Sequence, residues 1–111
     1  MKAIIRKIKY WFQRRTRGWS DDECWNLDLT FLQWINSRFK KYREQAGKIV
    51  DLSYFKFKYK GKTYTQLELI DKVIELSNMI LENYDSLERG YTKELHEIFK
   101  IFELIYWNMW W

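Results

Sequence analysis

The chain has 111 residues, of which 47% are hydrophobic and 20% are aromatic, and its formal net charge is +5. This length is typical of one domain, so we expect a single helical domain over residues 1–111. A single cysteine excludes an internal disulfide framework, and one histidine with one cysteine does not form the usual zinc site. We therefore expect no metal and no cofactor.

The charge is unevenly distributed along the chain. Residues 1–62 hold 16 Lys or Arg and 6 Asp or Glu, whereas residues 63–111 hold 4 and 9. Such a chain can orient in a partner's field or associate with copies of itself. Because cations interrupt the first apolar positions and the apolar stretch 98–111 is too short to span a bilayer, we expect neither a signal peptide nor a membrane partner.

The first predicted element is an amphipathic helix over residues 2–17. Its apolar positions, at helical spacing, are Ile4, Ile5, Ile8, Trp11 and Phe12. Gly18 is a natural helix end, because glycine adopts the left-handed conformation of a helix C-terminus readily. The apolar side of this helix is expected to pack in the bundle.

A second helix is predicted over residues 21–46. Ser20 and Glu23 have the spacing of a capping box, in which each side chain bonds to the other residue's backbone. Cys24 falls on the apolar stripe of this helix and is interpreted as a small core residue. Asp28 lies on the same stripe, where a carboxylate needs a partner.

A hairpin and two further helices complete the predicted fold. Aromatic residues alternate with lysines over residues 54–64, and Lys60-Gly61 indicates a tight turn, which together predict a small β-hairpin. Helices follow over residues 66–84, after a second capping box, and 92–109. The expected fold is mainly all-α: a compact helical bundle of about four helices with one small inserted β-hairpin.

The string Arg17-Gly18-Trp19-Ser20-Asp21, followed after a short gap by Trp25-Asn26-Leu27-Asp28, resembles a motif of small uncharacterised helical proteins that bacteriophages and prophages encode. The resemblance covers about twelve to fifteen residues and carries no biochemical activity with it. It implies that the chain is a phage accessory protein located in the cytoplasm of the bacterial host.

Residues of this motif also predict a polar clasp between the first two helices. Arg14, Arg15 or Arg17 is expected to close onto Asp28, because a guanidinium binds a carboxylate through two hydrogen bonds. The alternative interpretation is a polar ligand pocket. The predicted clasp residues are Arg17, Trp19, Ser20, Glu23, Trp25, Asn26 and Asp28.

Basic residues form a candidate site for phosphate or nucleic acid. Lysines on a ribbon can bind phosphates while aromatic rings stack on bases, but a solvated lysine face that prevents edge-to-edge pairing is the competing interpretation. The candidate residues are Arg14, Arg15, Arg17, Lys56, Lys58, Lys60 and Lys62.

The C-terminal segment is the candidate partner-binding surface. Aromatic residues are enriched in the cores of protein interfaces, whereas chain ends are normally solvated. Docking of the terminus into the core, self-association and capture of a partner all remain open. The candidate residues are Tyr106, Trp107, Trp110 and Trp111.

No arrangement of residues in the sequence predicts catalysis. Cys24 would need a base, but the only histidine is His96, and three acids precede the cysteine directly. We therefore expect a non-enzymatic protein that binds and blocks or sequesters a host component, such as a defence protein or its nucleotide signal. The alternatives are a nucleic-acid-binding module and a structural, self-assembling protein.

Overall fold

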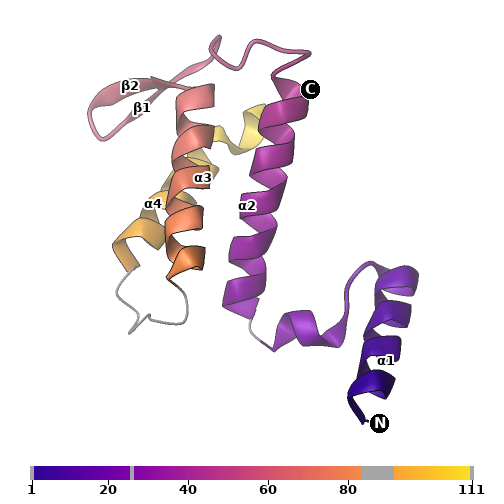
Figure 1. Ribbon diagram of the computed structural model, residues 1–111. Coiled ribbons are helices and arrows are strands. Elements are labelled where there is room, and N and C mark those ends of the chain that lie inside the picture. Colours follow the sequence, from indigo (N-terminus) through magenta and orange to yellow (C-terminus); the bar gives the residue numbers. More distant parts are fainter. Residues whose placement is uncertain (1, 26, 84–91, 111) are drawn as a thin grey trace. The chain divides into compact units, whose positions relative to one another are not determined.

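The computed structural model describes residues 2–25, 27–83 and 92–110 of the chain. It is predominantly helical, with one two-stranded antiparallel sheet, so the predicted mainly-α fold with a small hairpin is confirmed. The described chain forms two compact units, Met1–Phe31 and Leu32–Trp111 (Figure 1). Each unit is described below by itself.

The first unit contains helix α1, Lys2–Arg17, and a short 3-10 helix η1, Asp21–Cys24. Gly18 follows α1 with a φ of +88° and donates its N–H to the Arg14 carbonyl over 3.1 Å, which terminates the helix as expected. The prediction of a helix over residues 21–46 is wrong at its start, because the Ser20 capping box begins one 3-10 turn rather than a long helix. The α-helix itself, α2, begins at Leu27 and ends at Ala46.

The second unit holds the rest of α2 and all later elements. The hairpin strands are β1, Lys56–Tyr59, and β2, Lys62–Thr65, which precede α3, Gln66–Glu82. The chain ends with α4, Thr92–Ile105, and a 3-10 helix η3, Tyr106–Asn108. Of the predicted helix 66–84, Tyr84 lies outside the described residues, and the predicted helix 92–109 changes to 3-10 geometry after Ile105.

The hairpin is held in register by a tight turn. Tyr59 pairs with Lys62 across the turn, and Phe57 pairs with Tyr64. Both turn residues have a positive φ, +53° at Lys60 and +76° at Gly61, as a type I′ turn requires. Such a turn matches the right-handed twist of the flanking strands.

Helices α2, α3 and α4 enclose the core of the second unit. Phe39 of α2 is 2% exposed and stacks on Phe102 of α4, with ring centroids 5.9 Å apart. Other fully buried side chains are Ile35, Leu69, Ile70, Val73, Ile98, Ile101 and Ile105. Asp28 and Cys24, predicted to lie on the buried stripe of the second helix, are both exposed, because the buried positions begin only at Leu32 of α2.

One polar contact is built into the packing of α2 against α3. Asn36 of α2 is buried, and its amide donates to Ser77 Oγ and to Asn78 Oδ1, both over 2.8 Å. A buried amide is tolerated when its hydrogen bonds are formed, so these contacts fix how α2 and α3 align along their lengths.

We expect Phe39→Ala to lower the free energy of unfolding by about 3–5 kcal/mol, because it leaves a cavity against Phe102. Urea denaturation followed by circular dichroism measures this loss. The matched control is Phe12→Ala on α1, whose side chain is 61% exposed, and which should change the value by less than about 0.5 kcal/mol. Equal losses in the two variants would contradict the assignment of the core.

Candidate binding site

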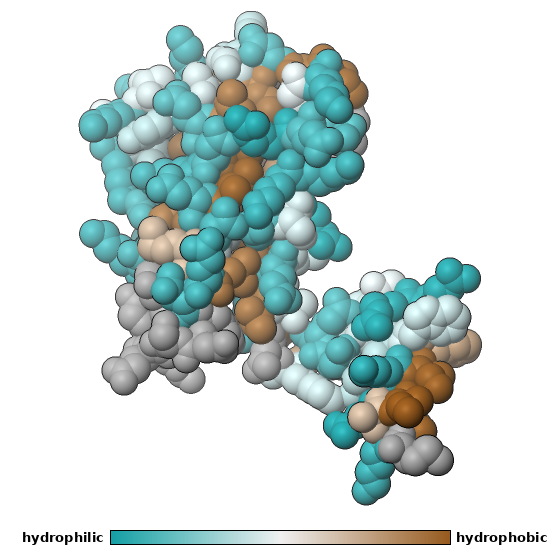
Figure 2. Space-filling view, in the orientation of Figure 1, coloured by the Kyte–Doolittle hydropathy of each residue, from teal (hydrophilic) through white to brown (hydrophobic). Residues whose placement is uncertain are grey.

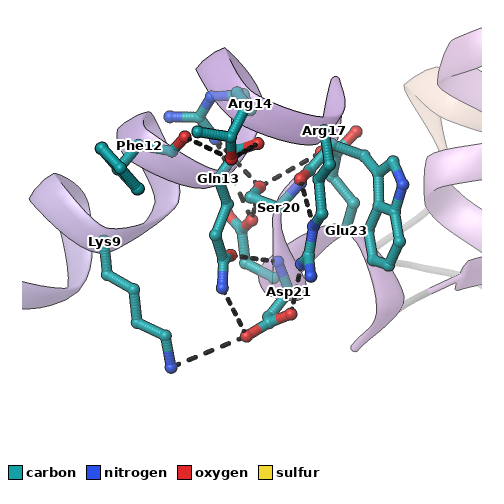
Figure 3. A network of polar contacts seen from close by, with 11 residues as sticks. Lys9, Phe12, Gln13, Arg14, Arg17, Ser20, Asp21 and Glu23 are labelled. Carbon is teal, nitrogen blue, oxygen red and sulfur yellow. Dashed lines mark hydrogen bonds and ion pairs between the residues drawn. The ribbon is translucent and has the colours of Figure 1, made fainter.

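A polar network joins the end of α1 to the turn that follows it (Figure 3). The carboxylate of Asp21 accepts a hydrogen bond from Gln13 Nε2 over 2.8 Å, pairs with Arg17, and lies 3.6 Å from Lys9 Nζ. These contacts, led by the hydrogen bond from Gln13, hold the pKa of Asp21 below its ordinary value. The side-chain oxygen of Gln13 also accepts a hydrogen bond from the Asp21 backbone N–H over 2.8 Å. The Gln13 amide therefore attaches the turn to α1 through both its nitrogen and its oxygen.

The second half of the network is centred on Ser20, which is completely buried. Its backbone N–H donates to the Glu23 carboxylate over 2.6 Å, which confirms the predicted capping box. Arg14 donates to Ser20 Oγ over 3.1 Å and lies 4.0 Å from the Asp22 carboxylate. Two of the three candidate phosphate-binding arginines, Arg14 and Arg17, therefore already have acidic neighbours within their own unit.

Several of the predicted clasp residues lie in this network, together with Asp21, which the prediction did not include. Arg17 pairs with Asp21, whereas Asp28 lies exposed in the first turn of α2. The Arg17 guanidinium lies 3.7 Å from the centroid of the Trp19 ring, and Trp25 makes an edge contact with Tyr10. Asn26 lies outside the described residues. Asp21 receives the guanidinium because Gly18 reverses the chain directly after α1.

The network uses only the polar side of α1. At 3.6 residues per turn, Lys9, Gln13 and Arg17 lie opposite Ile4, Ile8 and Trp11. No residue of α1 is buried, so the expected packing of its apolar side is not found within this unit. Figure 2 shows apolar surface over this helix. The exposed apolar residues are Ile4, Ile5, Ile8, Trp11 and Phe12.

We expect Asp21→Asn to loosen the turn, because the variant keeps the shape but loses the charge that Arg17 and Lys9 contact. Amide hydrogen exchange at Gly18 and Asp21 should become several-fold faster. The control Asp51→Asn, which replaces an exposed carboxylate of the second unit, should leave these two amides unchanged. Unchanged exchange in Asp21→Asn would show that the charge does not hold the turn.

The lysine hairpin is exposed, as the alternation predicted, but its cations are not equivalent. Lys56, Lys58 and Lys62 are exposed and form no ion pair within the described part of the chain. Lys60 instead pairs with Glu97 of α4, and the Tyr59 hydroxyl donates to the same carboxylate over 3.3 Å. The hairpin is thus attached to α4 through one of its four lysines.

A shallow hollow of about 380 Å³ lies where the hairpin meets α4. Lys58, Lys60 and Lys100 contribute three cations to it, and Glu103 contributes one carboxylate. The hydrogen bond from Lys60 is the main cause that lowers the pKa of Glu97, and it raises the pKa of Lys60 in return. This hollow is the part of the hairpin where an anion has the most cationic neighbours.

The pairing of Glu97 predicts a pH dependence of stability. Because its pKa is lower in the folded chain than the ordinary 4.5, the stabilisation is fully present above pH 4.5 and is lost as the pH falls through the folded pKa. The pKa of Lys60 is raised in the folded chain. At alkaline pH, the stabilisation from this ion pair is therefore lost as the pH rises through the folded pKa of Lys60.

We expect Glu97→Gln to lower the free energy of unfolding at about pH 7 and to match the unmodified chain at a pH well below the lowered folded pKa of Glu97, where both side chains are neutral. Urea denaturation at a series of pH values measures the difference. Glu75→Gln, at an exposed position of α3, is the control and should show no such convergence. Parallel curves for Glu97→Gln and the unmodified chain would refute the role of the ion pair.

The C-terminal segment is docked by its backbone. The Tyr42 hydroxyl donates to the Trp110 carbonyl over 2.9 Å and to the Asn108 carbonyl over 3.3 Å. Gln66 Nε2 donates to the same Asn108 carbonyl over 2.8 Å. Burial raises the pKa of Tyr42, so this donor stays protonated over the ordinary pH range.

The aromatic side chains of this docked segment remain in solvent. Tyr106 is 52% exposed, Trp107 is 85% exposed and Trp110 is 58% exposed. Trp111 lies outside the described residues. The terminus is therefore neither frayed nor inserted into the core by its rings: its carbonyls are bound, and its rings are presented outward.

An apolar cleft of about 530 Å³ lies beside the segment, between α2, α4 and the C-terminus. Sequence reasoning missed it because Trp34 and Arg38 of α2 come together with Tyr106 only in the folded chain. Helical spacing would have placed Trp34 and Arg38 side by side, but not opposite α4. The lining residues are Trp34, Arg38, Phe39, Lys41, Tyr42, Phe102, Tyr106 and Met109.

Within residues 2–25, 27–83 and 92–110, no three His, Cys, Asp or Glu side chains gather as a metal site would require. Cys24 is exposed in the first unit, and His96 is exposed on α4 of the second. None of the described helices combines the length and apolar composition needed to cross a bilayer.

Comparisons of the chain with models of protein families, with curated proteins and with solved structures found no match.

Proposed function

We propose that this chain is a non-enzymatic binding protein that blocks a host protein through its C-terminal aromatic surface, formed by Tyr106, Trp107 and Trp110. The observation that carries the proposal is the anchoring of this segment by its backbone carbonyls while its rings stay exposed. A segment held in this way presents its rings in a fixed arrangement before any partner arrives.

The energetics of association favour such a surface. Trp and Tyr are enriched among the few interface residues that contribute most of the binding free energy. Ordering a flexible segment on binding costs free energy, and hydrogen bonds that already fix the backbone reduce that cost. A surface with rings on a fixed backbone is therefore better suited to a protein partner than a frayed terminus would be.

The origin and target are part of the same proposal. The motif from Arg17 to Asp28 resembles bacteriophage and prophage proteins, which supports a phage accessory protein acting in the bacterial cytoplasm. Components of host defence are the class of protein that such an accessory protein would gain most by blocking. The motif belongs to the first unit and the aromatic surface to the second, so binding need not involve the motif.

Nucleic acid binding is a second candidate, favoured by one observation. Lys56, Lys58 and Lys62 are exposed and without ion pairs among the described residues, and Lys100 extends their charge onto α4. Binding through such cations weakens steeply as salt increases, because counterions are released. A gel shift with DNA and RNA at low salt tests it, and no shift for either would remove this candidate.

The proposed function predicts that Trp107→Ala reduces capture of a host protein from bacterial lysate by about tenfold or more, because a central interface tryptophan contributes about 2 kcal/mol or more. Trp107 is 85% exposed, so the substitution should not affect folding. Tyr54→Ala, at a 74% exposed position before the hairpin, is the matched control and should capture the same protein normally.

Light scattering of the purified chain distinguishes binding of a host protein from self-assembly. A mass above that of the monomer that returns to the monomer in Trp107→Ala would make the partner a second copy of the chain, which is the structural, self-assembling function. Equal capture of the same proteins by Trp107→Ala and the unmodified chain would refute the proposal.

A further inference from the structure

The cleft between α2, α4 and the C-terminal segment has an aromatic interior. Phe39 and Phe102 stack with centroids 5.9 Å apart, and Tyr106 makes an edge contact with Phe102 at 5.7 Å. Trp34, which is 44% exposed, lies at the solvent side of the cleft. These rings offer a planar ligand both apolar contact and stacking.

Two cations stand in this cleft without a carboxylate to neutralise them. The Arg38 guanidinium lies 5.2 Å from the centroid of the Trp34 ring, and its hydrogen bond goes to the neutral Ser37 hydroxyl. Neither Arg38 nor Lys41 forms an ion pair within the part of the chain that the structure describes. Among the residues that the structure describes, no Asp or Glu lines the cleft.

This pattern differs from the other basic regions of the chain. The Arg14 and Arg17 guanidiniums lie beside carboxylates of the turn after α1, and Lys60 pairs with Glu97. The hollow beside the hairpin contains Glu103 and only one aromatic ring, that of Tyr59. Aromatic rings and unpaired cations occur together in the cleft, where they complement a ligand that is both planar and anionic.

We propose that this cleft is a binding site for a small planar aromatic anion of the nucleoside monophosphate class. The base stacks against the rings of Trp34 and Tyr106, and Arg38 and Lys41 contact the phosphate. The volume of about 530 Å³ lies within the range of small-molecule sites, about 300–1,000 Å³. This site goes beyond the proposed function and shares only Tyr106 with the partner-binding surface, because neither Trp107 nor Trp110 lines the cleft.

The test titrates AMP into the full chain and follows the backbone and indole N–H signals by nuclear magnetic resonance. We expect saturable shifts at Trp34 and Arg38 with a Kd below about 1 mM. Adenosine, which lacks the charge, and inorganic phosphate, which lacks the ring, should each bind about tenfold more weakly or worse. The same shifts with phosphate alone at equal affinity would reveal only a generic anion site and overturn the proposal.

Variants separate the roles of ring and charge. Arg38→Gln and Trp34→Leu should each weaken AMP binding about tenfold, whereas Trp34→Phe, which retains a ring, should keep most of it. The control is Arg6→Gln on α1, which should leave AMP binding unchanged. Absence of saturable shifts with AMP, GMP and UMP, or equal binding by Arg38→Gln, would overturn the proposal, and neither result bears on capture of a host protein through Trp107.

Discussion

The arrangement of the second unit depends on the hydrogen bonds that the side chain and the backbone of Gln66 donate. Gln66 is 2% exposed, and its backbone N–H donates to the Phe55 carbonyl over 3.1 Å while its side chain donates to the Asn108 carbonyl over 2.8 Å. An amide that is buried without a partner costs about 1–3 kcal/mol. The hairpin, the start of α3 and the C-terminal segment therefore meet at one residue, and displacing the segment would leave the Gln66 amide with only its longer hydrogen bond, 3.5 Å to the Tyr42 hydroxyl.

This constraint explains why the C-terminal rings point away from the core. Tyr42 and Gln66 bind carbonyl oxygens, so the segment contributes its backbone to the protein interior and leaves the Trp107 and Trp110 rings exposed. Tyr106 and Met109, three residues apart as in one turn of a 3-10 helix, line the cleft, whereas Trp107 does not. One docking event thus creates two different surfaces, an open cleft and an exposed aromatic patch.

Local patterns in the sequence were sufficient to predict most of the secondary structure. Gly18 ends α1, the Thr65 and Glu68 side chains form the capping box that begins α3, and the Lys60-Gly61 turn forms as expected. These features depend on interactions between neighbours in the chain, which spacing alone reveals. The stripe on the second helix was misplaced because periodicity does not show whether a helix starts at Asp21 or at Leu27.

Contacts between distant residues were not predictable in the same way. Arg17 had acids within reach at Asp21 and Asp28, and the reversal of the chain at Gly18 decided between them. The Glu97 side chain is only 13% exposed and anchors the hairpin through Lys60, 37 residues away in the chain. Gln66 gave no signal beyond its place in a capping box, since its tertiary partner lies 42 residues away.

The cleft and the exposed aromatic patch suit different partners, because, among the described residues, the cleft contains cations without a paired carboxylate and the patch does not. Burying a cation is costly unless an opposite charge accompanies it, so Arg38 and Lys41 disfavour an apolar protein surface over the cleft and favour a ligand that brings its own negative charge. At the exposed patch, Trp107 can be covered by an apolar partner with no such cost, and each aromatic ring buried there contributes about 1.5–3 kcal/mol. The same chain end therefore suits an anionic small molecule on one side and a protein on the other.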